Sequence, residues 1–217
     1  MTGNDLNANL GLRMEDPAQS VFSSIAKMDA VNLAQKTVVN MIDNGYLTEL
    51  ETIDNNRSLT DGKFAFTGVI TPVRGGIIGV WDETNDLWCT MIEPSDVKRL
   101  ENSYLTGSVQ NPVAYIFNST VYVKPVEVAL VDIWYLKAPD DFIYSETGSG
   151  VGGMGSASPL NPALHELVLD FAEAQLWRMD AKSDRAASAY TSALNMIKTL
   201  NDRYQVEKPA GIGTKGR

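Results

Sequence analysis

The chain has 217 residues, of which 44% are apolar, so it is long enough to bury a substantial core. Its formal net charge of −9 argues against a surface that holds nucleic-acid phosphates through clustered Lys and Arg. One histidine, His165, and one cysteine, Cys89, exclude a Cys/His zinc cluster, a disulfide framework and a Cys–His nucleophile pair close in sequence. No apolar run reaches the roughly 20 residues that span a bilayer, and the polar start lacks signal-peptide features. We therefore expect no membrane contact and an intracellular, reducing environment.

The N-terminal part is predicted to be helical after an extended arm. Residues 1–16 are rich in Asn, Asp and Gly, which favours an arm ordered only by contacts with something else. Pro17 behind Asp16 fits the first turn of a helix, and Asn44-Gly45 fits its end. Helical spacing is followed by the apolar residues Val31, Ala34, Val38, Met41 and Ile42. The apolar face changes near Asp29, so the segment could form one long helix or two short ones.

Residues 55–139 change to an alternating pattern with frequent turn signals, which predicts an antiparallel β-meander. Trp81 and Trp88 are expected on facing strands, and Val97–Ser103 as a short helix. Strands are predicted at Val113–Phe117 and Thr120–Lys124, joined by a tight hairpin at Asn118-Ser119-Thr120.

The next predicted strand, Val126–Leu136, is apolar on both faces, so we expect both faces to be covered, and one of the covers could be another subunit. Asp132 lies within this strand and should find a polar partner, because an unpaired buried carboxylate is costly.

The C-terminal part is predicted to be a helical hairpin. Residues 145–158 have the Gly/Ser composition of a flexible loop, and no Gly-Lys-Ser/Thr ending supports a phosphate-binding loop. Two amphipathic helices are expected within 161–204, starting at Asn161-Pro162, and a basic, glycine-rich tail covers 205–217. The second helix should pack on the Leu164–Trp177 stripe through a narrow seam of Ala186, Tyr190, Ala193, Ile197, Leu200 and Tyr204. The prediction is thus a single α+β domain, residues 17–204.

The chemical candidates are few. His165-Glu166 lacks the second histidine of a zinc-protease motif, since Leu169 stands there, so His165 is expected to be a surface or packing residue. The acidic pairs Asp140-Asp141 and Asp96/Glu101 could hold a divalent ion, but such residues are common in turns. The tryptophans could form a binding platform, with at least two expected in the core: Trp81, Trp88, Trp134 and Trp177. We assign no catalytic, cofactor-binding or metal-binding residue.

The order of these elements resembles that of bacteriophage head-to-tail connectors, the adaptor or ring proteins that dock beneath the portal. The resemblance is carried by the strand pair 115–125, the strand and Ala-Pro ending 128–139, and the helices from 164 to 203. It covers most of the chain and is an order of elements, not a signature motif. The large β insert departs from smaller, mostly helical connectors, which leaves the level within the neck open. A tailed phage is implied, with the short-tailed crAss-like phages as one candidate group.

The resemblance implies a structural virion protein, not an enzyme, that forms a ring of twelve copies in the neck. The portal protein above and the next neck or tail protein below would be its partners, and genomic DNA would pass through the lumen without specific binding. It would assemble in the host cytoplasm without a cofactor. The arm 1–16, the loop 145–158 and the tail 205–217 would make the contacts.

Two other classes fit the residues. A minor capsid or tail structural protein would share the composition and differ in copy number. A glycan-binding or hydrolytic tail module would combine aromatic side chains with carboxylates, for instance Trp88 with Glu93.

Overall fold

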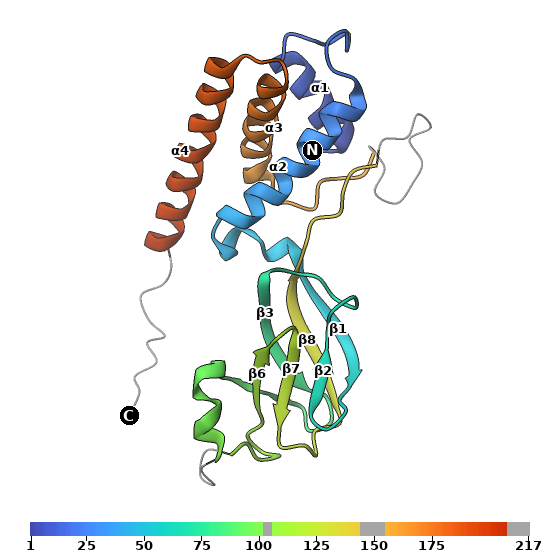
Figure 1. Ribbon diagram of the computed structural model, residues 1–217, viewed down its shortest axis with the longest axis vertical. Helices are drawn as coiled ribbons and strands as arrows, with labels where there is room; N and C mark the ends of the chain where they lie inside the picture. Colours follow the sequence, from blue (N-terminus) through green and yellow to red (C-terminus); the bar gives the residue numbers. More distant parts are fainter. Residues whose placement is uncertain (102–105, 144–154, 208–217) are drawn as a thin grey trace. The chain divides into compact units, whose positions relative to one another are not determined.

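The computed structural model describes residues 1–101, 106–143 and 155–207, which form two compact units (Figure 1). Unit 1 is helical and combines Met1–Glu49 with Pro139–Arg217, whereas unit 2 is Leu50–Ala138 and contains the strands. The α+β class is confirmed. The structure differs from the prediction of one domain over 17–204, because both ends of the chain build one helical core and the strands build another. The β-rich part also begins earlier than residue 55, at Glu51.

The prediction of an extended arm at 1–16 is wrong, because this segment contains helix α1, Gly3–Arg13. Thr2 caps the helix in a reciprocal capping box with Asp5, which satisfies backbone donors at the helix start. Leu6 and Leu10, four residues apart on one face, are fully buried. Burial of these two side chains holds α1 against the rest of unit 1, despite the many Asn and Gly residues of this segment.

Helix α2 spans Ser24–Met41 without a break at Asp29, so the single long helix is the correct alternative. It begins after the cap Ser23, and the expected start at Pro17 is wrong because Asp16 uses its side chain to order a loop instead. The helix ends at the extended residue Ile42 and is followed by short 3₁₀ turns at Asn44–Tyr46 and Thr48–Leu50.

Helices α3, His165–Met179, and α4, Ser183–Glu207, pack as the predicted hairpin after a 3₁₀ turn at Pro162–Leu164 that Asn161 caps. The seam is confirmed: Ala186, Ala193 and Ile197 are buried, and the Tyr190 ring meets the Phe171 ring edge to face at 5.5 Å. The Tyr204 side chain lies outside the described part. Helix α3 also packs on α2, and Figure 1 shows α3 between α2 and α4.

Unit 2 contains two four-stranded sheets, ordered β1-β8-β3-β4 and β2-β7-β6-β5. The strand bounds are β1 Glu51–Ser58, β2 Lys63–Ala65, β3 Pro72–Asp82, β4 Leu87–Trp88, β5 Thr90–Met91, β6 Val113–Phe117, β7 Thr120–Lys124 and β8 Leu130–Lys137. Antiparallel pairing dominates as predicted, but the order is not that of a meander, since β8 inserts between β1 and β3 and β5 pairs with β6 in parallel.

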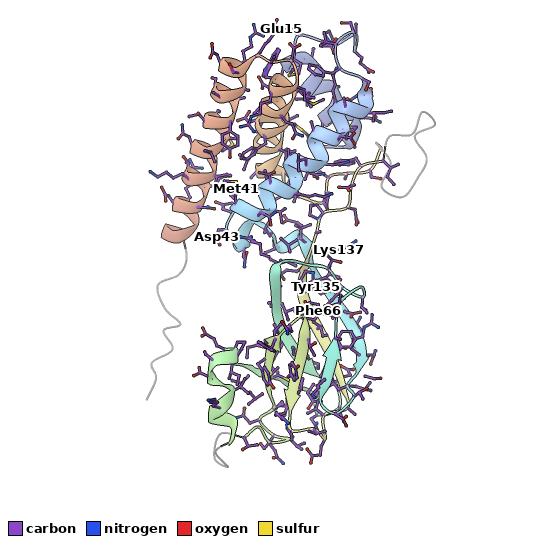
Figure 2. The ribbon with its side chains drawn as sticks, viewed as in Figure 1. Glu15, Met41, Asp43, Phe66, Tyr135 and Lys137 are labelled. Carbon is purple, nitrogen blue, oxygen red and sulfur yellow. The ribbon has the colours of Figure 1, made fainter. Side chains whose placement is uncertain are left out.

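One apolar cluster forms the core of unit 2 and draws side chains from both sheets. It includes Val80, Val131 and Ile133 from one sheet and Val121 and Val123 from the other. Figure 2 labels two further members, Phe66 and Tyr135. This core explains the alternating burial of β8, whose other face is only half-buried within the single chain.

Several local predictions are confirmed within unit 2. Strands β6 and β7 have the predicted bounds, and Asn118 and Ser119 both have positive φ, as a tight hairpin turn requires. Strand β8 begins later than the predicted Val126. Asp132 has the expected polar partner, because its carboxylate accepts a hydrogen bond of 2.7 Å from the backbone N–H of Asn56. Asn56 lies in the irregular part of β1, where the pairing with β8 shifts. The short helix near Val97 is a 3₁₀ helix, Pro94–Glu101.

Two predicted segments fall mainly outside the described residues. The Gly/Ser loop 145–158 is described only from residue 155, and the tail 205–217 only to residue 207. Helix α4 includes the first three residues of that tail, through Glu207.

Candidate functional site

Unit 1 contains a groove between α2 and α4, with α3 as its floor. Its volume is about 380 Å³. The walls come from Leu33 and Thr37 of α2 and Tyr190 of α4, and Ala34 and Ala174 provide small side chains at depth. Leu33 is 49% exposed, so a large apolar side chain faces solvent at the rim. The groove exists because α2 and α4 both pack on α3 and leave part of its surface uncovered.

A cationic side chain closes one end of this groove. The Arg178 guanidinium lies over the Tyr190 ring, 5.0 Å from its centre, and both residues line the groove. Among the described residues no carboxylate lies within ion-pair distance of Arg178. Exposed cation–π contacts are worth about 0.5–1 kcal/mol, enough to orient the guanidinium while leaving its donors available.

Two more cations lie at the adjoining α3–α4 turn. Lys182 and Arg185 stack over the buried Trp177, with Nζ and Cζ at 4.8 and 4.7 Å from the ring centre. The indole N–H of Trp177 donates a hydrogen bond of 3.1 Å to the Glu173 carboxylate, which fixes the orientation of the ring. The predicted binding-platform role of Trp177 does not fit this burial, and its ring instead supports the two cations of the turn, of which Lys182 also pairs with Asp180 at 2.7 Å.

Helix α1 carries an exposed apolar stripe that borders a second hollow, of about 280 Å³, beside the loop that precedes α2. Ala8 and Leu12 are exposed on one face, and Leu12 is 65% exposed. Glu15 lies just past the end of α1 with a φ of 57°, and among the described residues its carboxylate pairs with the exposed Arg185 at 3.7 Å. Figure 2 shows Glu15 at the end of unit 1. We call Ala8, Leu12 and Glu15 the α1 ridge.

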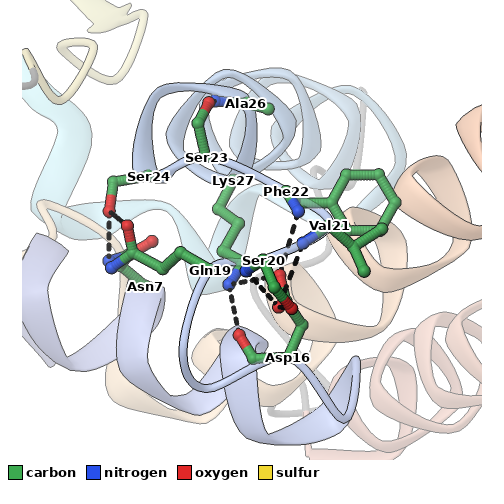
Figure 3. A network of polar contacts seen from close by, with 10 residues as sticks. All are labelled: Asn7, Asp16, Gln19, Ser20, Val21, Phe22, Ser23, Ser24, Ala26 and Lys27. Atoms are coloured by element: carbon green, nitrogen blue, oxygen red, sulfur yellow. Dashed lines mark hydrogen bonds and ion pairs between the residues drawn. The ribbon is translucent and has the colours of Figure 1, made fainter.

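A buried polar network fixes α1 relative to α2 (Figure 3). The Asp16 carboxylate, 2% exposed, accepts hydrogen bonds from the backbone N–H groups of Ser20, Val21 and Phe22. The Lys27 ammonium, 1% exposed, donates to the Asp16 carbonyl at 2.8 Å and lies 3.3 Å from its carboxylate. This pair orders the loop between the helices and therefore sets the position of the α1 ridge.

Arg13 provides a second anchor for α1. Its guanidinium pairs with Glu166 and Asp170 of α3, and Glu173 lies 3.6 Å away. Burial alone would lower the pKa of Arg13, but the hydrogen bond to Asp170 and the charges of the three carboxylates outweigh it and raise the pKa. The guanidinium therefore stays charged and the contact persists at every physiological pH.

The Asp16 network predicts acid sensitivity. The Phe22 backbone N–H is the main cause of a lowered pKa at Asp16, with Ser20 and Val21 adding to it against burial. The unfolded chain therefore binds this proton more readily, so the stability from Asp16 is present above about pH 4 and is lost as the pH falls further. Urea unfolding between pH 6 and pH 2.5 should show a steeper acid loss for the wild type than for Asp16→Asn. The exposed variant Asp184→Asn should keep the wild-type slope, and equal slopes for all three would contradict the network.

Unit 2 carries an aromatic cluster on the face of its first sheet that lies opposite the core. The Trp88 ring packs edge to face against Trp81 at 5.2 Å and Trp134 at 5.5 Å, and Trp81 pairs with Trp88 across β3 and β4 as predicted. A Cβ atom at Gly79 would lie 2.8 Å from Cζ3 of Trp88, so only glycine admits this ring. Trp88 is 50% exposed. The rings contact one another closely and form a packed patch.

The remaining chemical candidates are dispersed. His165 is buried at the start of α3, where burial is the main cause of its lowered pKa, and its Nδ1 lies 3.2 Å from the Met1 amine. Its Nε2 has no hydrogen-bond partner among the described residues. Asp141 pairs with Lys36 at 2.8 Å, which gives that acidic pair a structural contact.

Within residues 1–101, 106–143 and 155–207, no three His, Cys, Asp or Glu side chains are grouped to hold a metal ion. The same part of the chain contains no helix with the length and apolar content of a membrane span. No recorded contact in it joins Trp88 to Glu93, which instead receives a hydrogen bond from Ser95.

Sequence reasoning missed the two surfaces that matter most in unit 1. The composition of residues 1–16 predicts an arm, and therefore does not reveal the α1 ridge. Two local signals do indicate a helix: Thr2 and Asp5 have capping-box spacing, and Leu6 and Leu10 have helical spacing. The groove depends on how three helices diverge, for which no local sequence pattern exists.

The chain matches no known protein-family model, and no curated protein is significantly similar to it.

Proposed function

We propose that this chain is a structural subunit of a tailed-phage particle that forms a ring in the neck. In this role it joins the portal to the tail and lets the genome pass. The proposal rests on the resemblance in the order of elements, and it assigns the chain no enzymatic activity. A short-tailed, crAss-like phage is one particle in which such a subunit would serve.

The observation that carries the proposal is the presence of two different exposed surfaces on unit 1. A subunit of a closed ring needs two different patches, one to receive a neighbour and one to enter the next. The groove lined by Leu33 and Arg178 and the α1 ridge around Leu12 are two such patches, since the groove contains one cation and the ridge combines an exposed leucine with the Glu15 carboxylate.

The partners follow from the ring. Copies of this chain, twelve in the proposal, would surround the lumen, with the portal protein on one side and the next neck or tail protein on the other. Genomic DNA would pass without specific binding, in keeping with the net charge of −9, because an acidic wall repels a polyanion. The protein would reside in the virion after assembly in the host cytoplasm.

Copy number in the purified native particle tests this function. Quantitative mass spectrometry against the major capsid protein should give about a dozen copies for a neck ring. Hundreds of copies would favour the minor capsid alternative, and absence from the particle would reject a virion role.

The glycan-binding alternative has one observation in its favour, the half-exposed Trp88 in an aromatic patch. We expect Trp88→Ala to lower the free energy of unfolding by about 1–2 kcal/mol, because each edge-to-face pair contributes about 0.5–1.5 kcal/mol. Retention of the particle on immobilised host glycans should be unchanged. Loss of retention by the folded variant would favour the glycan-binding module over the neck ring.

A further inference from the structure

We infer that the α1 ridge of one copy docks head to tail in the α2/α3/α4 groove of a second copy. The inference rests on the proposed function, because it specifies the contact through which the ring would close. A head-to-tail contact uses different patches on the two copies, so repetition of one rotation builds a ring.

The two surfaces match in spacing. The groove floor follows one face of α3 through Phe171, Ala174 and Arg178, at intervals of three and four residues. The ridge follows one face of α1 through Ala8 and Leu12, at an interval of four. Helices that enter grooves are recognised through side chains at such intervals.

The two surfaces also match in size. Ala34 and Ala174, both small and buried, line the groove together with the larger Leu33 and Phe171. Leu12, at 65% exposure, is the most exposed large apolar side chain recorded among the described residues, and its insertion there would cover Leu33 as well. This is the arrangement in which one side chain enters a hole formed by several residues of the facing helices.

Charge fixes the direction of docking. Glu15 follows Leu12 by three residues, just past the end of α1, and Arg178 follows Ala174 by four residues on α3. One docking direction of Leu12 in the groove therefore brings the two opposite charges to the same end. Among the described residues of the single chain, Glu15 has a weak exposed ion pair and the Arg178 guanidinium contacts the Tyr190 ring. The basic tail, with Lys208, Lys215 and Arg217, carries the same sign of charge as Arg178 and is the less favourable occupant.

Each copy retains access to both surfaces. Helix α1 packs on α2 and α3, whereas the groove opens between α2 and α4. The ridge lies on α1, which does not line the groove. One copy can therefore use its ridge and its groove at the same time.

Cysteine cross-linking of the full-length chain tests the contact even when assembly is weak. Leu12→Cys and Leu33→Cys are made in separate chains and mixed under mild oxidation. The native Cys89 should not interfere, because burial raises the pKa of its thiol to about 12. Both replaced residues are exposed, so the fold should persist, which circular dichroism verifies.

The mixed variants should cross-link about tenfold faster than a mixture of Leu12→Cys with Phe117→Cys, an exposed position outside unit 1. Equal rates in the two mixtures would overturn the inference. Adding Arg178→Glu to the Leu33→Cys chain should slow cross-linking, and adding Glu15→Arg to the Leu12→Cys chain should restore it. Slowing without restoration would reject the Glu15–Arg178 pairing.

The result separates the contact from the function. Specific cross-linking with hundreds of copies in the particle would retain the contact and reject the neck ring. A dozen copies without specific cross-linking would retain the ring and place its interface elsewhere.

Discussion

Lys27→Met will lower the free energy of unfolding by about 3 kcal/mol, because it removes one partner of a buried ion pair. Lys27 is 1% exposed and donates to the Asp16 carbonyl, with the carboxylate 3.3 Å away. Methionine fills a similar volume, so the loss reports the buried carboxylate left without its cation. Urea unfolding of the full chain at pH 7 measures the effect.

The matched control is Lys36→Met on the same helix. Lys36 pairs with Asp141 at 2.8 Å, but both side chains are about half exposed, so this change should cost less than about 1 kcal/mol. A Lys27→Met variant as stable as this control would show that Asp16 needs only its hydrogen bonds from Ser20, Val21 and Phe22.

Local patterns predicted the fold wherever adjacent residues determine the structure. The β6–β7 hairpin follows from two aromatic strands around Asn118 and Ser119, whose positive φ values the turn requires. The α3–α4 hairpin follows from apolar residues at helical spacing. The order of strands did not follow, since β8 enters between β1 and β3 through contacts far apart in sequence.

The candidate site was harder to predict because its parts come from separate elements. Asp16 was interpreted as the residue before a helix, yet its buried carboxylate orders the loop 20–22 and pairs with Lys27. Composition suggested an arm at 1–16, and two buried leucines override that composition. The contact between Arg178 and the Tyr190 ring depends on how α3 and α4 cross. The spacing of apolar residues predicts that the two helices pack, but not which side chains meet at the crossing.

Ile197→Asp will destabilise the protein by about 4 kcal/mol, because it removes a buried apolar side chain and places a charge in a packed helix interface. Ile197 is buried in the α4 seam against α3, between the buried Ala193 and the half-buried Leu200. Thermal unfolding followed by circular dichroism should show a large fall in Tm, with α3 and α4 unfolding together because each forms the other's apolar cover.

Asn195→Asp supplies the control, since Asn195 is exposed two residues earlier on the same helix and should tolerate the charge with little change in Tm. An Ile197→Asp variant that melts with this control would show that the seam adds little to the stability of unit 1. In that case α4 would depend on another copy for its packing, and the Tm of the wild type would rise with protein concentration.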